Sequence, residues 1–238
     1  MISVENLNKS FKTADGERSV LKNVSLKISE GETVVIGGEN GSGKSVLMNI
    51  IAGLEKVDSG KIEVSEKIGY VFQEAETQIL GETVLEDVSF GPKNLKFSKE
   101  KINENVKKAL EITRLTDKQN YTARFLSGGE KRRLAIACML SMDLPVLILD
   151  EPYANLDYCG VKQVNSLIKE LQNQKKTVII LTHEIEKCLA LSKRFVVLFR
   201  GEIKFDGKSE DAVKMNLEQW NIKNPLNSYK KLDDLVWL

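Results

Sequence analysis

One glycine-rich octapeptide narrows the possible folds further than any other part of the chain. Residues 38–45 read GENGSGKS and match the pattern G-x-x-x-x-G-K-[ST] in full. The apolar run 33–37 before it is typical of a buried strand, and the periodicity from Lys44 onward predicts a helix. A glycine-rich turn between a strand and a helix N-terminus presents backbone N–H groups and partial positive charge to one anion. The sequence therefore predicts a phosphate-binding loop; the alternative is a plain glycine-rich turn.

Two side chains of this loop have separate predicted roles. Lys44 can reach the β- and γ-phosphates of a nucleotide, and the Ser45 hydroxyl can ligate Mg²⁺. We expect nine residues in and next to the loop to contact the nucleotide: Gly38, Glu39, Asn40, Gly41, Ser42, Gly43, Lys44, Ser45 and Val46.

Further apolar runs place the loop in an α/β fold. Residues 145–150 and 177–182 are short buried-strand runs, and a helical pattern covers about 161–172 between them. Strands that alternate with helices in this way predict a parallel sheet covered on both faces.

Two other regions complete the predicted fold. In residues 2–7 and 20–28 apolar and polar side chains largely alternate around a turn at 13–17, which predicts an antiparallel β layer. The middle of the chain, about 82–142, has helical periodicity and no buried-strand runs, so we interpret it as a helical insertion into the sheet domain. Beyond Gly207 the pattern indicates only a short helix near Asp211.

Composition limits the class of protein. The 238 residues include 35 Lys and Arg against 34 Asp and Glu, a net charge of +1, which removes the strongest electrostatic argument for nucleic-acid binding and leaves a local basic patch as the alternative. The longest apolar runs fall far short of the ~20 residues that span a bilayer, and the start of the chain shows no secretory signal. Cys138, Cys159 and Cys188 are widely spaced, which suits reduced thiols in a cytosol better than disulfides or a zinc cluster.

Three polar side chains follow the two later buried strands. Asp150 and Glu151 end the first of them, and His183 ends the second. Ligands bind at the carboxyl edge of a parallel sheet, so we expect all three near the phosphates. Asp150 can hold Mg²⁺, Glu151 can polarise an attacking water as a general base, and the neutral imidazole of His183 can hydrogen-bond the γ-phosphate or the water. For His183, a strand-end histidine with a purely structural role is the alternative.

A second potential anion site begins at Ser127. Residues 126–130 read LSGGE and precede a helical pattern, so Ser127, Gly128 and Gly129 offer backbone N–H groups at a positive helix end. One bound nucleotide has little use for two such cradles unless the second serves a nucleotide held by another subunit. An N-capped helix with a flexible entry is the alternative.

These motifs, in this order and spacing, resemble the ATP-binding-cassette (ABC) ATPase family over about residues 1–207. The resemblance implies a P-loop NTPase fold with a RecA-like parallel core, an N-terminal antiparallel β subdomain and an inserted helical subdomain at about 75–143. It also implies one domain over 1–238, with a short C-terminal tail at about 208–238. The cofactors implied are ATP and Mg²⁺, and the activity is ATP hydrolysis.

In that family the LSGGE pentapeptide closes on the partner's ATP, so the resemblance implies a head-to-tail dimer with two ATP molecules at its interface. Gln73 matches the Q-loop glutamine, a Mg²⁺ and water contact that also senses the membrane subunit. Asp157 matches the D-loop aspartate, which passes information across the dimer.

Two segments narrow the resemblance. Residues 72–79 and 82–95, with Gln78 and the Phe90–Pro92 tripeptide as their specific parts, resemble the ATPase subunits of energy-coupling-factor (ECF) transporters, which import vitamins and transition-metal ions. The helical face there can form a groove for an amphipathic coupling helix of a membrane protein. A variable surface insertion is the alternative.

The chain also departs from the family pattern. Val46 stands where a second Ser or Thr is usual, and Asn155 replaces a common small residue before Leu156. We choose Phe11 as the aromatic that stacks on adenine; an alignment through the following turn would place Thr13 there instead.

The function implied is that of an ATP-hydrolysing subunit at the cytoplasmic face of a membrane, paired with a second ATPase subunit. Its expected membrane partners are a transmembrane coupling subunit and a substrate-binding subunit. The alternatives are the ATPase of an export or lipoprotein-release system, which residues 9–11 and 20–25 resemble, a soluble non-transport ABC ATPase and a nucleotide-binding regulatory module.

Overall fold

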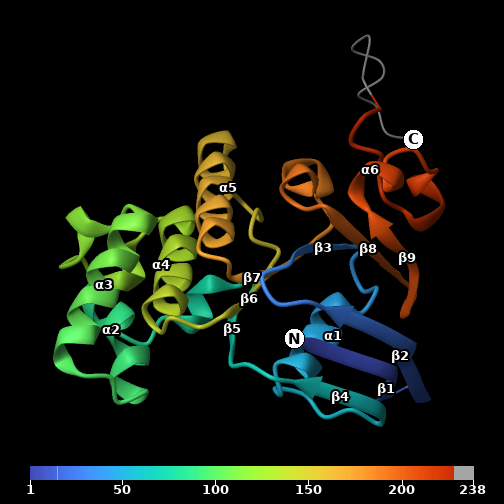
Figure 1. Cartoon of the computed structure of the whole chain (residues 1–238), viewed down its shortest axis with the longest axis horizontal. Helices are drawn as coiled ribbons and strands as arrows, with labels where there is room; N and C mark the ends of the chain where they lie inside the picture. Colours follow the sequence, from blue (N-terminus) through green and yellow to red (C-terminus); the bar gives the residue numbers. More distant parts are fainter. Residues whose placement is uncertain (15, 228–238) are drawn as a thin grey trace.

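The computed structural model describes residues 1–14 and 16–227, which form two β-sheets and a helical lobe (Figure 1). The larger sheet has six strands in the order β5-β6-β7-β3-β8-β9, of which the first five are parallel and β9 is antiparallel to β8. The predicted parallel sheet is confirmed. Its strands are β3 (Thr33–Gly37), β5 (Ile68–Val71), β6 (Val146–Asp150), β7 (Thr177–Thr182), β8 (Arg194–Phe199) and β9 (Glu202–Lys208).

Helices cover both faces of this sheet, as the alternation of strands and helices predicts. Helix α1 (Lys44–Ile51) packs on one face and α5 (Tyr158–Asn173) on the other. Side chains alternate along β3, so Val34 and Ile36 enter the core on the α1 side and Val35 enters the core on the α5 side. The carboxyl ends of the buried strands are thereby fixed between two hydrophobic layers.

The predicted antiparallel layer is also confirmed. It has the strand order β2-β1-β4, formed by β1 (Ile2–Thr13), β2 (Gly16–Ile28) and β4 (Ser59–Val64). Leu7 and Leu21 from this layer share the core that contains α1. The antiparallel sheet therefore supports the helix that follows the phosphate loop.

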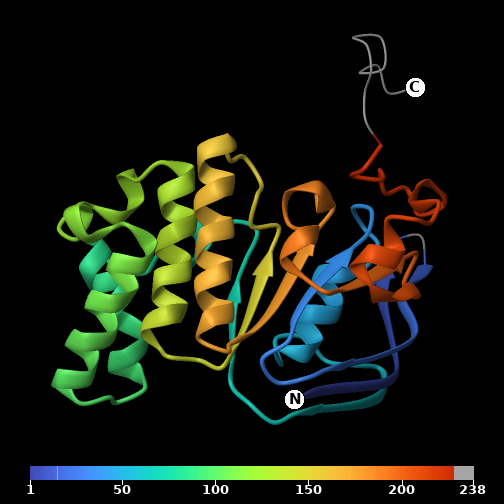
Figure 2. The same cartoon turned by 45° about the horizontal axis from the view of Figure 1, so that its top comes forward.

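The helical insertion lies between β5 and β6 and forms a lobe beside the sheets (Figure 2). Its helices are α2 (Val84–Asn94), α3 (Lys99–Thr113) and α4 (Gly128–Ser141), and α4 lies next to α5, where Arg133 donates a hydrogen bond to Gln163. The lobe buries its own hydrophobic cluster. Short 3-10 helices connect these parts: η1 (Ala75–Gln78), η2 (Thr116–Lys118) and η3 (Ala123–Phe125).

The C-terminal part of the chain returns to the sheet. After β7 come η4 (Ile185–Lys187) and η5 (Leu189–Leu191), and after β9 come α6 (Ser209–Ala212) and η6 (Leu217–Trp220). The short helix predicted near Asp211 is α6. Of the expected tail at about 208–238, residues 228–238 lie outside the described residues.

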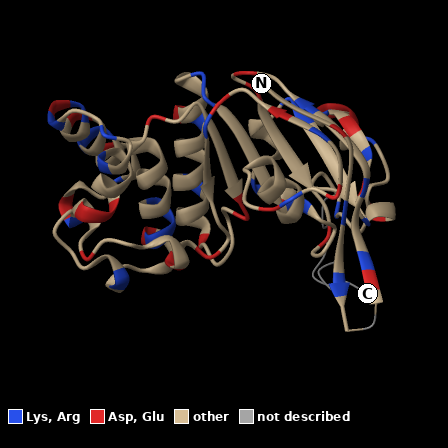
Figure 3. Cartoon of the chain, turned by 90° about the horizontal axis from the view of Figure 1, so that it is seen from below, with Lys and Arg blue, Asp and Glu red and all other residues tan. Residues whose placement is uncertain are grey.

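No helix in the described residues combines the length and the apolar character that crossing a bilayer requires. Lys and Arg residues are interspersed with Asp and Glu residues over the sheets and over the helical lobe (Figure 3).

Candidate nucleotide site

Three glycines shape the loop between β3 and α1. Gly41 and Gly43 have φ angles of 81° and 105°, in the left-handed region that favours glycine, and Gly43 is the N-cap of α1. A Cβ atom at Gly38 would lie 2.1 Å from the carbonyl oxygen of Leu198, because β8 packs directly on the loop. The predicted phosphate loop thus has the strand–turn–helix setting that its pattern requires.

Lys44 points back across this loop. Its Nζ donates hydrogen bonds to the carbonyl oxygens of Gly38 (2.8 Å) and Glu39 (3.1 Å), and it lies 3.9 Å from Oε1 of Glu151. Burial lowers the pKa of Lys44, and the nearby carboxylates partly oppose that shift. A buried ammonium held only by carbonyl oxygens and a carboxylate 3.9 Å away is well placed to bind an anion.

The other loop residues differ in exposure. The Ser42 hydroxyl is buried and has no hydrogen-bond partner within the described part of the chain, although its backbone carbonyl accepts from Gly201 of the β8–β9 turn (3.1 Å). Ser45 and Asn40 are exposed, so their side chains are free to reach a ligand. Val46 is half-buried against the core around α1. A buried orphan hydroxyl in the cradle fits a phosphate oxygen, which would supply the missing partner.

Asp150 ends β6 in a buried, hydrogen-bonded position. The Tyr70 hydroxyl donates to its Oδ2 at 2.9 Å, and the guanidinium of Arg132 donates to its backbone carbonyl at 3.4 Å. The buried Oδ1 receives no hydrogen bond of standard geometry, although the Ser45 hydroxyl is close enough to influence the carboxyl group. Burial raises the pKa of Asp150, and the donors Ser45 and Tyr70 oppose this rise.

Glu151 and His183 are in contact at the ends of the neighbouring strands β6 and β7. Oε1 of Glu151 lies 2.9 Å from Nδ1 of His183, and its Oε2 accepts a hydrogen bond from the Thr182 hydroxyl at 3.0 Å. Glu151 has a φ of 45°, an uncommon backbone conformation for a residue other than glycine. Because a carboxylate only accepts, Nδ1 of His183 donates the proton in its hydrogen bond to Glu151.

Gln73 forms no hydrogen bond with Asp150 or Glu151. It is exposed in the turn after β5. Gln78 holds this turn closed, because its carboxamide accepts from the Phe72 N–H (2.9 Å) and donates to the Tyr70 carbonyl (2.8 Å). The Gln78 side chain therefore pairs with two backbone groups at the end of β5, as the backbone of a neighbouring strand would.

The structure does not bring the second anion cradle to the phosphate loop. Ser127, Gly128 and Gly129 begin α4, which lies apart from α1 in both views (Figures 1 and 2). Ser127 is exposed and forms a capping box with Glu130, whose pKa falls to about 2 because Lys118 and Ser127 donate to it. A Cβ at Gly128 would meet no atom within 4 Å, so this face of the turn is open.

Asp157 is separate from the phosphate loop as well. It is the N-cap of α5 and accepts from the Gly160 N–H at 2.7 Å. Its neighbour Leu156 lies within 3.4 Å of where a Cβ of Gly129 would be, so the start of α5 and the start of α4 adjoin. The predicted motifs that contain Gly129 and Asp157 thus lie next to each other.

Comparison with known proteins shows the family of this chain. A family model described as ABC transporter matches residues 21–154, more than half of the chain. The chain belongs to the ABC transporter family. It is an ABC ATPase, which couples ATP hydrolysis to transport.

Individual ABC proteins are similar over most of their length. The energy-coupling factor transporter ATP-binding protein EcfA1 of Fusobacterium nucleatum is 40% identical over 221 residues, which cover 87% of this chain and 82% of that protein. The structure of cbiO1 from Clostridium perfringens, part of the ABC transporter complex cbiONQ, superposes with a TM-score of 0.80 at 33% identity, covering 94% and 95% of the two chains. The ATP-binding cassette MJ0796, a dimer bound to ADP and Pi, has a TM-score of 0.80 at 31% identity, covering 88% and 99%.

Phe11 is the residue predicted to stack on adenine. It is half-exposed on β1, opposite Arg18 of β2, with the Lys9 ammonium 4.8 Å from its ring centroid. Two residues further along β2, Val20 approaches the loop, because its carbonyl oxygen would lie 3.1 Å from a Cβ of Gly43. Thr13 is at the end of the hairpin, where its hydroxyl donates to the Gly16 carbonyl. Phe11 remains our prediction for the residue that stacks on adenine.

Sequence reasoning missed several residues of this site. Tyr70 and Thr182 donate to the carboxylates of Asp150 and Glu151, and Arg132 donates to the backbone carbonyl of Asp150, yet no spacing pattern marks these three residues. Tyr70 and Thr182 lie on strands that pair with or neighbour β6, so strand order is the signal that could have found them. Asn221 donates to Glu39 from the far end of the chain, and no local signal indicates this contact.

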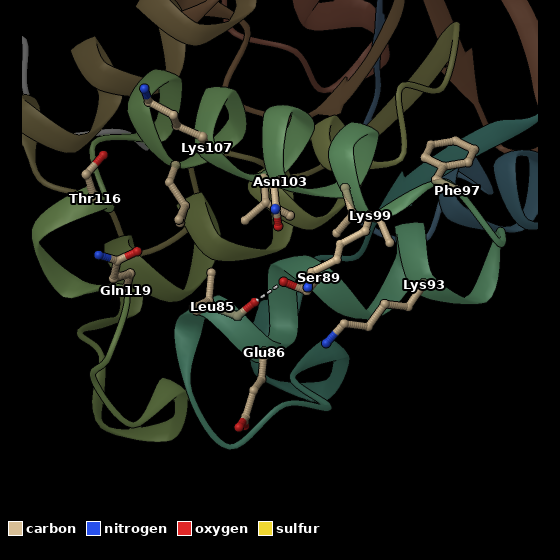
Figure 4. Close-up of a pocket in the computed structure, with 13 residues that line it drawn as sticks. Leu85, Glu86, Ser89, Lys93, Phe97, Lys99, Asn103, Lys107, Thr116 and Gln119 are labelled. Atoms are coloured by element: carbon tan, nitrogen blue, oxygen red, sulfur yellow. Dashed lines mark hydrogen bonds between the residues drawn. The ribbon is translucent and has the colours of Figure 1, made fainter.

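Two hollows lie in the ABC protein's helical lobe. One cavity, of about 660 Å³, lies between α2 and α3 and contains none of the predicted nucleotide-site residues (Figure 4). The other, of about 450 Å³, lies between α2, α4 and the turn after β5. Phe72 and Gln78, at the end of β5 and in the turn after it, line this second hollow.

Proposed function

We propose that this ABC ATPase is the motor subunit of an ECF-type importer of a vitamin or a transition-metal ion. One observation carries the proposal: the two ECF-like segments, 72–79 and 82–95, line the same groove of about 450 Å³. Gln78 comes from the first segment, and Phe90 and Gly91 come from the second. Segments that resemble one transporter class therefore build one surface.

The groove has the character of a docking site for an amphipathic helix. On its rim Leu80 is 67% exposed and Phe90 is 47% exposed. Met139 of α4 and Met142, the residue that caps its C-terminus, form part of its wall. Exposed apolar side chains beside adaptable methionines suit the apolar face of a helix. We infer that a transmembrane coupling subunit inserts such a helix here, at the cytoplasmic face of the membrane, and that a substrate-binding membrane subunit completes the importer.

The residues at the sheet edge fit magnesium as well as ATP. Asp150 has a carboxylate oxygen without a standard hydrogen bond, and Ser45 has an exposed hydroxyl. Mg²⁺ prefers oxygen ligands and is usually held by one or two carboxylates together with substrate phosphates. We infer that Ser45 and Asp150, with Gln73 as a third contact, hold the ion, which when bound neutralises charge on the transferred phosphoryl group.

The chain's own groups supply the remaining chemistry. Lys44 exchanges the Gly38 and Glu39 carbonyls for phosphate oxygens, and the orphan Ser42 hydroxyl gains a partner in the same event. The Glu151 carboxylate takes the proton of the attacking water as general base, while His183 and Thr182 fix its orientation.

A second copy of the chain, or a related ATPase, completes the site. The cradle at Ser127 is exposed and open and is not joined to its own phosphate loop. Two chains arranged head to tail would place each such cradle on the ATP held by the other, so that ATP closes the pair and hydrolysis allows it to open. This movement would reach the membrane partner through the groove beside Gln73.

Purification of the intact membrane complex tests the importer assignment. We expect the full chain to co-purify with an integral coupling subunit and a small substrate-capturing membrane protein. Phe90→Asp should abolish this association, while the control Leu54→Asp, at a residue that is 58% exposed and outside the groove, should retain it. Co-purification with an export or lipoprotein-release permease instead would overturn the ECF assignment.

A further inference from the structure

The segment after the last strand returns to the phosphate loop. Helix η6 ends at Asn221, which has left-handed backbone angles (φ 57°, ψ 31°). On either side, Leu217 and Ile222 are buried in the same core as Val35 of β3, and the Ile222 N–H donates to the Leu217 carbonyl at 3.2 Å. The place of Asn221 is therefore fixed by the hydrophobic core.

From this position Asn221 contacts the second residue of the loop. Its Nδ2 donates a hydrogen bond of 2.7 Å to Oε2 of Glu39. The backbone carbonyl of Glu39 accepts from Lys44 Nζ and also from the Ser42 N–H at 3.2 Å. One residue thus links the C-terminal segment to the lysine of the cradle.

The Glu39 side chain is a liability in an anion-binding loop. It is half-buried and lies within the loop that binds phosphate in the proposed function. Its negative charge acts on Lys44, where it opposes the lowering of the lysine pKa by burial. A carboxylate free to swing toward Lys44 would repel phosphates and compete with them for the ammonium. Asn221 is neutral, so it holds the carboxylate by a hydrogen bond to an ionised group without adding a charge of its own.

We propose that Asn221 is a positioning residue for nucleotide binding: its carboxamide holds the Glu39 carboxylate at the edge of the phosphate loop and keeps it from pairing with Lys44. This inference rests on the proposed role of residues 38–45 as the phosphate loop. It assigns a role in the ATPase to a segment beyond the last strand of the sheet.

Removal of the Asn221 side chain in the full chain tests the role. Asn221→Gly removes the carboxamide and tolerates the left-handed backbone. We expect the Kd for ATP, measured by calorimetry, to rise about tenfold, since hydrogen bonds to charged groups contribute about that much. The rise should be smaller for ADP, which carries less charge, and should shrink at high salt, because exposed charges are screened.

A double-mutant cycle separates this role from a merely structural one. With the charge removed by Glu39→Gln, the further change Asn221→Gly should alter the ATP Kd less than about twofold. Asn224→Gly is the matched control, because Asn224 lies in the same segment and donates to the Val213 carbonyl, away from the loop. It should leave ATP affinity unchanged even if the stability of the segment falls.

Three outcomes overturn the inference. They are an unchanged ATP Kd in folded Asn221→Gly, an equal loss of affinity in the Glu39→Gln background, or the same loss in Asn224→Gly. The variant Lys44→Ala distinguishes a failure of the phosphate-loop assignment from a failure of the role of Asn221 alone. If Lys44→Ala binds ATP as the wild type does, the phosphate-loop assignment fails together with this inference; if it loses binding while Asn221→Gly does not, only the role of Asn221 fails.

Discussion

At the scale of single residues, Glu151 combines an uncommon backbone conformation with three side-chain contacts. The φ of 45° is held in place while Thr182 and His183 bind the carboxylate and Lys44 lies 3.9 Å away. Conformations of this kind persist where the surroundings enforce them, and they cluster at functional sites. The carboxylate is thus oriented before a nucleotide arrives.

Glu151→Gln should separate ATP binding from ATP hydrolysis. The amide keeps the shape of the side chain but cannot take a proton from water, so we expect turnover to fall by about 10²- to 10⁴-fold while ATP affinity is retained. Phosphate release and calorimetric titration, with the membrane partner present, measure the two quantities. Glu104→Gln, at an exposed residue of α3, is the control, and near wild-type turnover in Glu151→Gln would exclude the general-base role.

Asp150→Asn should raise the stability of the fold and lower the ATPase activity. Burial raises the pKa of Asp150 in the folded protein. The folded state therefore binds the proton of this carboxyl group more tightly than the unfolded chain does. At neutral pH, where the group is ionised in the unfolded chain, the carboxyl group consequently lowers the free energy of unfolding. We expect Asp150→Asn to raise the free energy of unfolding at pH 7, and this gain to vanish as pH falls toward the unfolded pKa of about 3.9.

The same substitution should lower Mg²⁺-dependent hydrolysis by about 10²-fold, because a bound metal contributes several kcal/mol to the transition state. Urea unfolding at several pH values measures the stability, and phosphate release measures the activity. Asp117→Asn, at an exposed residue, should change neither quantity. If Asp150→Asn instead lost stability at pH 7, the ionised carboxylate would be a stabilising group and the expected pH dependence would be wrong.

At the scale of secondary-structure elements, the end of β5 depends on one side chain. Gln78→Glu keeps the acceptor for the Phe72 N–H but cannot donate to the Tyr70 carbonyl. A buried acceptor left without a donor costs about 1 to 3 kcal/mol, so the free energy of unfolding should fall by that amount. Urea denaturation measures the change, and Gln219→Glu at an exposed position is the control. Equal stabilities of the two variants would show that Gln78 does not hold this turn.

The elements differ in how well the sequence predicts them. Strands β3, β6 and β7 are buried on both faces and stand out as apolar runs, so their positions agree with prediction. Strand β4 is not predicted, since four of its six residues are exposed and only Ile62 and Val64 are half-buried. The partners of the carboxylates could not be predicted either, because Tyr70 meets Asp150 across 80 positions, through strand pairing that a linear pattern does not contain.

At the scale of the whole molecule, the phosphate loop before α1 and the predicted second cradle at the start of α4 are separate. ATP-dependent crosslinking tests whether two chains join them. Asn40→Cys and Ser127→Cys place thiols at exposed positions of the phosphate loop and of the second cradle, in a chain that also carries Glu151→Gln and Cys159→Ser. With ATP and a short thiol crosslinker, we expect covalent dimers only when both new cysteines are present.

The controls for this experiment are the two variants that carry only one of the new cysteines, and each should stay monomeric on a denaturing gel. Equal yields of dimer with and without ATP would contradict a nucleotide-closed pair. So would the absence of crosslinks when the complete membrane complex is assembled.

Helix α4 is shared between two hydrophobic cores. Its residues Ala135 and Ile136 pack into the core of the large sheet, whereas Leu134 and Ala137 belong to the separate core of the helical lobe. The helical lobe therefore has an interior of its own and yet shares a helix with the sheet core. A rigid displacement of α4 relative to β6 would move the whole lobe as one body, without repacking the cluster inside it.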